Sequence, residues 1–216
     1  MVNNNPADGI QYWNGTVWAT LTPSLDGTNS LYSSQMIITF KDRLLALNTW
    51  EGTSSGAAIN YGNRCRFSQN GSPLASDAWR QDTPGKGSFI DCPTSEAAIS
   101  AEFIKDRLIV FFQRSTWELA YTGNQVLPFV WQKINTEFGA ESTFSVVPHD
   151  KIAYSIDSVG ILACNGANVE RIDQIIPEEI FQFSNDNNGP LRTYGIRDYE
   201  MELVYWTYSA LPPDGS

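Results

Sequence analysis

The chain has 216 residues, of which 42% are hydrophobic, 18% charged and 12% aromatic. This is enough apolar material for one or two packed domains, and it argues against disorder. The aromatic, glycine and proline content favours short strands and excludes an all-helical bundle. The 24 acidic and 14 basic residues give a net charge of −10, which disfavours a protein that binds nucleic acid tightly through its phosphates.

Residues 1–33 form a leading segment ahead of the more regular part of the chain. Residues 11–18 are predicted to form a hairpin on the Asn14-Gly15 turn, or the closing strand of an earlier unit. The first residues lack the basic flank and apolar core of a secretory signal, so we expect synthesis in the cytoplasm. No apolar run approaches the roughly 20 residues of a membrane-spanning helix, so we expect no membrane span.

Residues 34–216 carry a recurring pattern in which a polar turn leads into an apolar strand. It occurs at Phe40–Leu44 and Ile104–Leu108, both with Lys-Asp-Arg at their centre, and more loosely at Pro148–Ile152. The strands that follow are rich in β-forming residues and too short for helices. We expect three of them to be equivalent: Arg43–Leu47, Leu108–Phe112 and Ile152–Ser155.

A second repeated feature follows each of these strands, namely an apolar stretch that ends in a glycine turn. The glycines are Gly71, Gly123 and Gly166, at intervals of 52 and 43 residues. Four-stranded propeller blades recur at about 40–50 residues. A fourth unit is predicted to start at Tyr194–Asp198 and to continue through Glu202–Tyr208.

The sequence therefore predicts an all-β fold of repeated antiparallel sheets, arranged as a partial or incomplete β-propeller over residues 34–216. A closed propeller of six blades would need roughly 250 residues or more at this period. Three explanations for the shortage of residues stay open. The chain is a piece of a longer polypeptide, or it is a smaller β-sandwich of the same hairpins, or other chains supply the missing strands.

Candidate catalytic and metal-binding residues are few. His149 stands at a position like those of Lys41 and Lys105, which favours a solvated turn residue over a general base or metal ligand. Asp42, Asp106 and Asp150 recur before strands and are expected to cap turns. Three cysteines at wide spacing fit neither a zinc site nor a disulfide framework, so we expect buried free thiols at the following positions: Cys65, Cys92 and Cys164.

Three further segments depart from the functional motifs that they partly match. Ser155–Gly160 is too long for the turn of sialidases, and Ser184–Gly189 lacks the first and last ligands of a calcium loop. Thr83–Ser88 has the composition of a phosphate-binding loop without its glycine spacing. We therefore expect no catalytic residue, no cofactor-binding residue, no metal site and no enzymatic activity.

Several tryptophans follow or lie within the predicted strands. Tryptophan contributes a large buried area per residue, so we expect these side chains to pack between neighbouring sheets. Stacking of exposed tryptophan on a sugar is the alternative. The residues are Trp50, Trp79, Trp117, Trp131 and Trp206.

The stretch Asn63–Leu74, followed by Asp77-Ala78-Trp79, resembles a recurring line in bacteriophage tail proteins. These are the propeller-containing tail nozzle, tail tubular and DNA-stabilisation proteins of short-tailed phages. The two Lys-Asp-Arg strand entries and Thr116–Leu119 also look like that family.

The resemblance implies a structural virion protein in a ring or nozzle around the DNA exit path, below the head-to-tail adaptor. Expected partners are other copies of the chain, other tail and adaptor proteins, and DNA that passes without tight binding. The acidic balance fits such a conduit. The alternative is a carbohydrate-binding propeller or adhesin at the tail tip, and a glycan-cleaving propeller enzyme ranks third.

Overall fold

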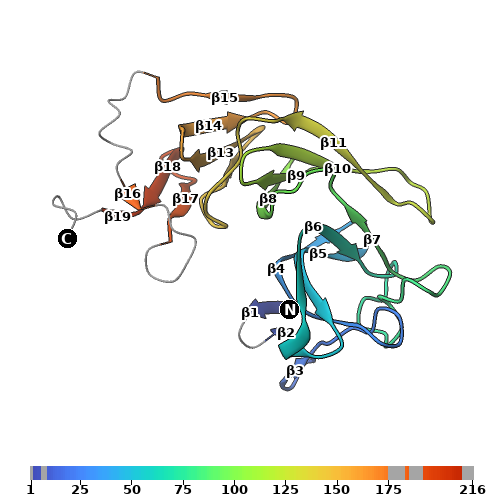
Figure 1. Ribbon diagram of the computed structural model, residues 1–216. Helices are drawn as coiled ribbons and strands as arrows, with labels where there is room; N and C mark the ends of the chain where they lie inside the picture. The colour runs from blue at the N-terminus through green and yellow to red at the C-terminus, as the bar shows by residue number, and fades with distance from the viewer. Residues whose placement is uncertain (1, 6–8, 175–182, 185–191, 211–216) are drawn as a thin grey trace. The chain divides into compact units, whose positions relative to one another are not determined.

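The computed structural model describes residues 2–5, 9–174, 183–184 and 192–210 (Figure 1). These residues form antiparallel sheets and a single turn of 3-10 helix at Ser55–Ala57. The all-β prediction is therefore confirmed. The chain divides into two compact units, Met1–Ala98 with Tyr121–Val130, and Ile99–Ala120 with Trp131–Ser216.

The first unit opens with a small sheet of β1 (Val2–Asn5), β2 (Gly9–Trp13) and β3 (Trp18–Thr20). The hairpin predicted over residues 11–18 is present as β2–β3, but its loop has four residues rather than two. The Asn14 side-chain oxygen accepts hydrogen bonds from the backbone N–H groups of Thr16 (2.9 Å) and Val17 (3.0 Å). This side-chain turn replaces the tight Asn-Gly turn.

The main sheet of the first unit contains four strands in chain order. They are β4 (Ser30–Phe40), β5 (Arg43–Gly52), β6 (Ile59–Phe67) and β7 (Ser88–Asp91). The predicted boundary between residues 33 and 34 falls inside β4. A buried cluster supports the unit, made of Ile10, Leu25, Leu31, Leu44, Ala46, Ala78 and Trp79.

Two more four-stranded sheets follow, again in chain order. One contains β8 (Ala98–Ile104), β9 (Arg107–Phe112), β10 (Thr116–Tyr121) and β11 (Phe129–Asn135). The other contains β12 (Val147–His149), β13 (Ile152–Asp157), β14 (Gly160–Cys164) and β15 (Val169–Arg171). In the second unit their buried side chains form one core, with Ile104, Ile109 and Phe111 from one sheet and Ala153, Leu162, Cys164 and Val169 from the other.

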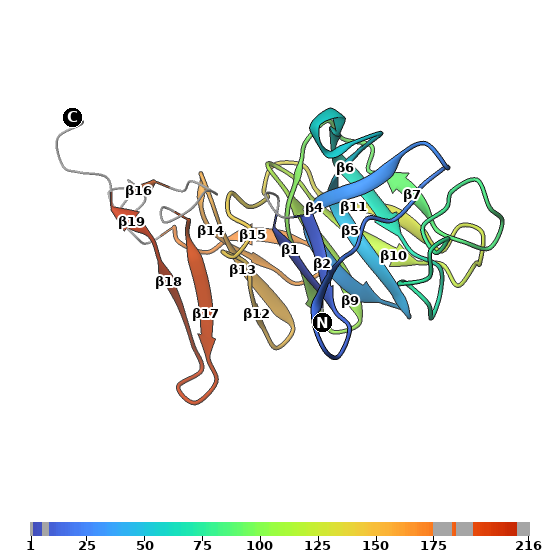
Figure 2. The ribbon, with the colours of Figure 1, turned by 90° about the horizontal axis from the view of Figure 1, so that it is seen from below.

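The remaining strands form two small sheets. The short strands β16 (Phe183–Ser184) and β19 (Ser209–Ala210) pair with each other, and β17 (Tyr194–Asp198) pairs with β18 (Leu203–Thr207). The β17–β18 hairpin coincides with the start of the predicted fourth unit. Figure 2 shows its strands running side by side to a loop at their far end.

The predicted equivalence of three strands is confirmed, because β5, β9 and β13 are each the second strand of a four-stranded sheet. Each follows a two-residue connection, at residues 41–42, 105–106 and 150–151. The predicted alignment of Pro148–Ile152 with the other two turns was wrong by one residue. His149 pairs with Ile152 as the last residue of β12, so Asp150 takes the first turn position. Asp150 has φ 56°, as Lys41 (51°) and Lys105 (58°) do.

The glycine turns are also equivalent. Gly71, Gly123 and Gly166 each follow the third strand of a sheet, with φ values of 70°, 75° and 84°. Glycine enters this left-handed region without the steric cost that other residues meet. The repeat unit is thus a four-stranded meander with a tight first turn and a glycine in its third connection. The propeller arrangement of these units stays a prediction.

Candidate functional site

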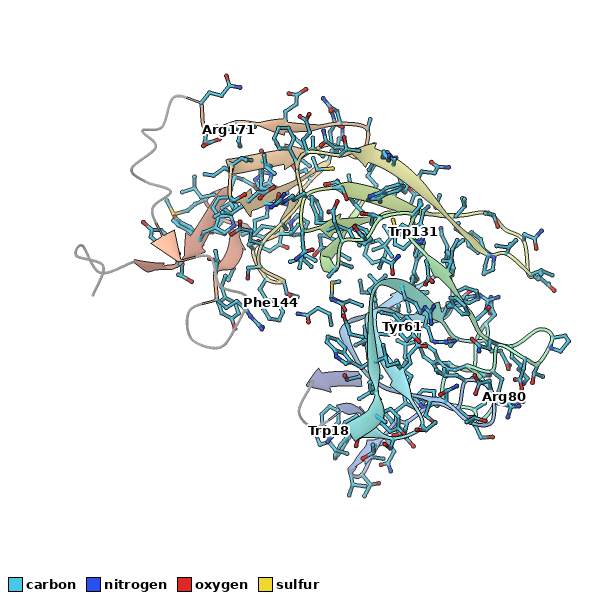
Figure 3. All side chains as sticks on the ribbon, in the orientation of Figure 1. Trp18, Tyr61, Arg80, Trp131, Phe144 and Arg171 are labelled. Carbon is cyan, nitrogen blue, oxygen red and sulfur yellow. The ribbon has the colours of Figure 1, made fainter. Side chains whose placement is uncertain are left out.

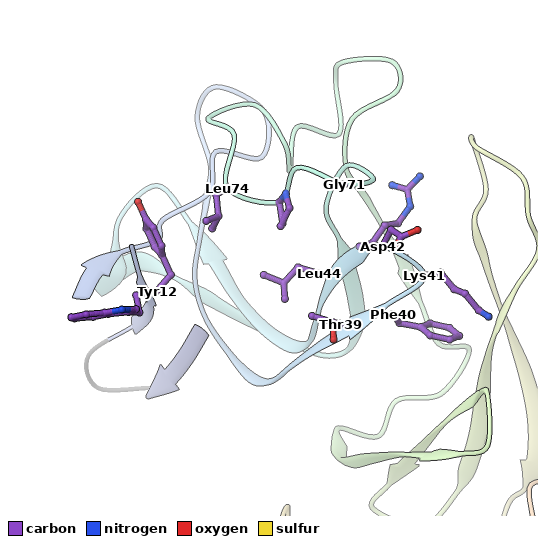
Figure 4. Close-up of a pocket in the computed structure, with 11 residues that line it drawn as sticks. Tyr12, Thr39, Phe40, Lys41, Asp42, Leu44, Gly71 and Leu74 are labelled. Atoms are coloured by element: carbon purple, nitrogen blue, oxygen red, sulfur yellow. The ribbon is translucent and has the colours of Figure 1, made fainter. Parts of the chain in front are cut away.

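A pocket of about 540 Å³ lies in the first unit, between β2, the β4–β5 turn and the loop that follows β6. Tyr12 lies at one end and Lys41 and Asp42 at the other, with Leu44 and Leu74 between them (Figure 4). The pocket therefore joins an aromatic end to a charged end across an apolar middle. Pockets with this mixture are the usual binding sites of proteins.

The aromatic end extends onto the β2–β3 hairpin. Trp13, which lines the pocket, is 42% exposed, and Trp18 beside it is 45% exposed. Their rings meet edge to face with centroids 5.9 Å apart. Two exposed indoles in one hairpin provide an apolar surface, and exposed aromatic groups gathered in this way mark interaction sites.

The charged end is formed by the β4–β5 turn. The Lys41 ammonium lies 5.5 Å from the Phe40 ring centroid and 5.9 Å from that of Tyr121. Among the described residues it makes no ion pair. Arg43, by contrast, is buried and donates from Nη1 to the Ser68 carbonyl at 2.7 Å. Lys41 is therefore the cation that a ligand could reach.

Aromatic packing behind the turn holds this end of the pocket in place. Phe129 stacks on Phe40 with centroids 5.7 Å apart and meets Phe67 edge to face at 5.4 Å. The Arg43 guanidinium lies 5.6 Å from the Phe67 ring. Aromatic pairs of this kind each contribute about 0.5–1.5 kcal/mol beyond area burial, so they stabilise the β4–β5 turn at this end of the pocket.

A second feature of the first unit is a buried ion-pair network on β5 and β6. Glu51 is 5% exposed and accepts hydrogen bonds from Arg66 Nε and Nη2 (both 2.7 Å), from Arg64 Nη1 (3.1 Å) and from the Thr49 hydroxyl (2.7 Å). Burial raises the pKa of Glu51, but the two arginines and Thr49 outweigh it and hold that pKa below its ordinary value. The network joins β5 to β6 and was not predicted from the sequence.

Arg64 is fixed further by the faces of two rings. Its guanidinium carbon lies 3.9 Å from the ring centroids of both Tyr61 and Phe89 (Tyr61 is labelled in Figure 3). It also donates from Nε and Nη2 to the two carboxylate oxygens of Asp91 at 2.8 and 2.9 Å. All three guanidinium nitrogens therefore donate to carboxylates of the chain, and the Arg64 side chain is only 11% exposed, so its role is structural.

His149 lies in a different network in the second unit. Its Nε2 is 3.2 Å from Glu202 Oε2, and ligand atoms of His149, Asp150 and Glu202 lie within 4.8 Å of one another. Arg197 Nη2 donates to both carboxylates, at 2.9 Å to Asp150 and 2.6 Å to Glu202. A divalent cation would have to displace this guanidinium, so the arrangement favours an ion-pair cluster over a metal centre.

The predicted cysteines and most of the predicted tryptophans have structural roles. All three cysteines are free and buried, as expected, and burial raises the thiol pKa of Cys65 and Cys164. Trp79, Trp117 and Trp131 are buried, and the Trp206 indole donates to the Ser145 carbonyl at 2.8 Å. The motif at Ser184–Gly189 lies largely outside the described residues.

The sequence matches no protein-family model and no curated protein. In the part of the chain that the structure describes, no helix is long and apolar enough to cross a membrane.

Proposed function

We propose that the chain is a structural subunit of a phage tail, part of a ring or nozzle around the DNA exit path and located in the virion. The observation that carries the proposal is the repeated four-stranded meander, with β5, β9 and β13 at equivalent positions. This repeat extends through the segments that resemble tail proteins of short-tailed phages.

Large exposed apolar side chains support a role in assembly. They occur on the β2–β3 hairpin and on the β17–β18 hairpin, where Ile196 is 66% exposed and Tyr205 is 46% exposed. Protein surfaces of this kind mark contacts with other proteins. The proposed partners are other copies of the chain and neighbouring tail and adaptor proteins.

We propose no catalysis for this subunit. Its one cluster of His and acidic side chains within the described residues, His149 with Asp150 and Glu202, is engaged by Arg197. Turnover assays on glycosides, esters, peptides and nucleotides should stay at background. Hydrolysis that disappears when one Asp or Glu is replaced would contradict the proposal.

Sedimentation and duplex DNA binding test the structural role. The purified chain should associate with increasing concentration, and electron microscopy of the associated form should show rings. The net charge of −10 predicts weak duplex binding at every salt concentration, because there is little cationic surface to displace counterions. An ideal monomer, or submicromolar binding of duplex at moderate salt, would contradict it.

Carbohydrate binding is the second candidate, and the exposed Trp13 and Trp18 beside the pocket favour it. Sugars stack on exposed aromatic rings. Trp13→Ala should then abolish binding in a glycan screen, whereas Tyr208→Ala, at a 49% exposed aromatic elsewhere, should not change it. A screen with no binding by the wild-type chain would remove this candidate.

A further inference from the structure

The β17–β18 hairpin has two faces of different character. Gly195, Arg197, Val204 and Trp206 form the half-buried inner face, whereas the outer face exposes four large apolar side chains. Their exposed fractions range from 44% to 66%, and the residues are Tyr194, Ile196, Leu203 and Tyr205. Phe144, labelled in Figure 3, stacks on Tyr194 with centroids 5.3 Å apart and extends this apolar surface.

The hairpin is held firmly by the rest of the second unit. Trp206 Nε1 donates to the Ser145 carbonyl and the Gly195 N–H donates to the Phe144 carbonyl, both at 2.8 Å. A Cβ on Gly195 would collide with Val147. The outer face is thus presented by a fixed element and not by a loose tail.

The loop at the end of the hairpin presents two more apolar side chains and one free carboxylate. Tyr199 is 73% exposed and Met201 is 64% exposed. Asp198 Oδ1 shapes the loop by accepting from the N–H groups of Glu200 (2.9 Å) and Met201 (3.0 Å). The Glu200 side chain makes no ion pair with any described residue. We call Tyr199–Met201 the hairpin tip.

The pocket of the first unit offers apolar surface and a cation, although the exposed Asp42 carboxylate shares the charged end with that cation. Trp13 (42% exposed) and Leu74 (49%) offer apolar surface, and the Lys41 ammonium has no carboxylate partner among the described residues. We propose that the hairpin tip of one copy docks into this pocket of a second copy, with Tyr199 and Met201 against the apolar surface and Glu200 beside Lys41. This inference rests on the proposed role as an assembling subunit.

Such a contact joins two different surfaces of the same chain. An interface of this kind is heterologous, and it produces a ring when the rotation between neighbours closes. The charge pair would mainly select the orientation, since exposed ion pairs contribute little affinity. The apolar side chains of the tip would supply most of the binding energy.

Crosslinking between two different single-cysteine variants tests the contact directly. Met201→Cys and Leu74→Cys, purified separately, mixed and treated with a short bismaleimide, should give a crosslinked dimer. Only contacts between copies can produce it, and the three native thiols are buried. The matched control pairs Met201→Cys with Val126→Cys, a residue 85% exposed in a different loop, and should give background.

A charge exchange gives a second, independent measurement. Lys41→Glu and Glu200→Lys should each weaken association, on the order of fivefold, as measured by sedimentation. The double variant Lys41→Glu/Glu200→Lys should recover wild-type association. Both side chains are exposed, so the variants should fold, and circular dichroism is the measurement that checks this.

The outcomes separate this inference from the proposed function. If the wild-type chain associates but the cysteine pair does not exceed its control and the charge variants associate normally, the docking inference is wrong and the structural role stands. If the wild-type chain stays monomeric at high concentration, both are wrong. Crosslinking together with recovery in the double variant supports both.

Discussion

The two arginine–carboxylate networks differ in how much water reaches them. In the first unit, Glu51 and Arg66 are 5% and 2% exposed at their side chains, and Glu51 joins β5 to β6. In the second unit, Arg197 holds Asp150 and Glu202, whose side chains are 69% and 57% exposed. The carboxylates are therefore buried in the first network and exposed to water in the second, whereas the Arg197 side chain that joins them is only 11% exposed.

This difference decides what each network does. A buried charge that loses its partner stays uncompensated, so breaking a buried pair is strongly destabilising even when the intact pair adds little. Water and salt replace a lost partner at the surface. We infer that the first network determines the stability of its sheet and that the second orients the hairpin with little effect on stability.

The largest predicted effect is that of Glu51→Ala. This substitution leaves Arg66 buried without its carboxylate and should lower the free energy of unfolding by about 3–5 kcal/mol, measured by urea denaturation. The double variant Glu51→Ala/Arg66→Met removes both charges and should recover much of the loss. A single variant as stable as the wild type would show that water enters the network.

The pH dependence of stability tests the role of the buried network in a second way. The pKa of Glu51 lies below its ordinary value of 4.5 in the folded chain, so its contribution is fully present above that value and is lost as pH falls through the folded pKa. In the Glu51→Gln variant, the free energy of unfolding should therefore fall less steeply as the pH is lowered through the acid range. An unchanged slope would assign acid unfolding to other carboxylates, such as Asp173, whose pKa Arg171 lowers against the opposing effect of burial.

A smaller effect is predicted for Arg64→Lys. Lysine keeps the charge but loses the paired hydrogen bonds to Asp91 and the flat contact between Tyr61 and Phe89. We expect a loss of about 1–2 kcal/mol in the free energy of unfolding. The comparison with Glu51→Ala then separates geometry from charge, and a loss as large as that of Glu51→Ala would contradict this separation.

The smallest effect is predicted for Glu202→Gln in the exposed network. Water can replace the lost charge, so the midpoint of urea denaturation should not change measurably. Asp150 still pairs with Arg197 in this variant. A destabilisation comparable to that of Glu51→Ala would mean that the two networks are equivalent and that our comparison is wrong.

The repeat could be predicted from the sequence because its signals are local. The Lys-Asp pairs at 41–42 and 105–106 and the glycines at 71, 123 and 166 each specify a turn through a few adjacent residues. The third turn was placed one residue early because His149 and Asp150 are both polar. Polarity alone does not distinguish the last strand residue from the first turn residue.

The buried network could not be predicted, because it depends on strand register. Between Leu47 and Thr49 the pairing of β5 with β6 shifts at a bulge. Asn48 lies there with φ 53°, and its side-chain amide donates to the Ala98 carbonyl at 3.0 Å. A register drawn without this bulge would misplace the residues opposite Glu51. The pocket was also missed, since it joins segments distant in the sequence.

The meander order of the sheets has a consequence for how the chain folds. In each four-stranded sheet every strand pairs with its neighbour in the sequence, so no sheet has to wait for a distant segment. Contacts between near neighbours close small loops and speed folding relative to β-proteins with long crossovers. During synthesis, each sheet can form once its last strand has left the ribosome, which shortens the time for which unpaired strand edges are exposed to aggregation.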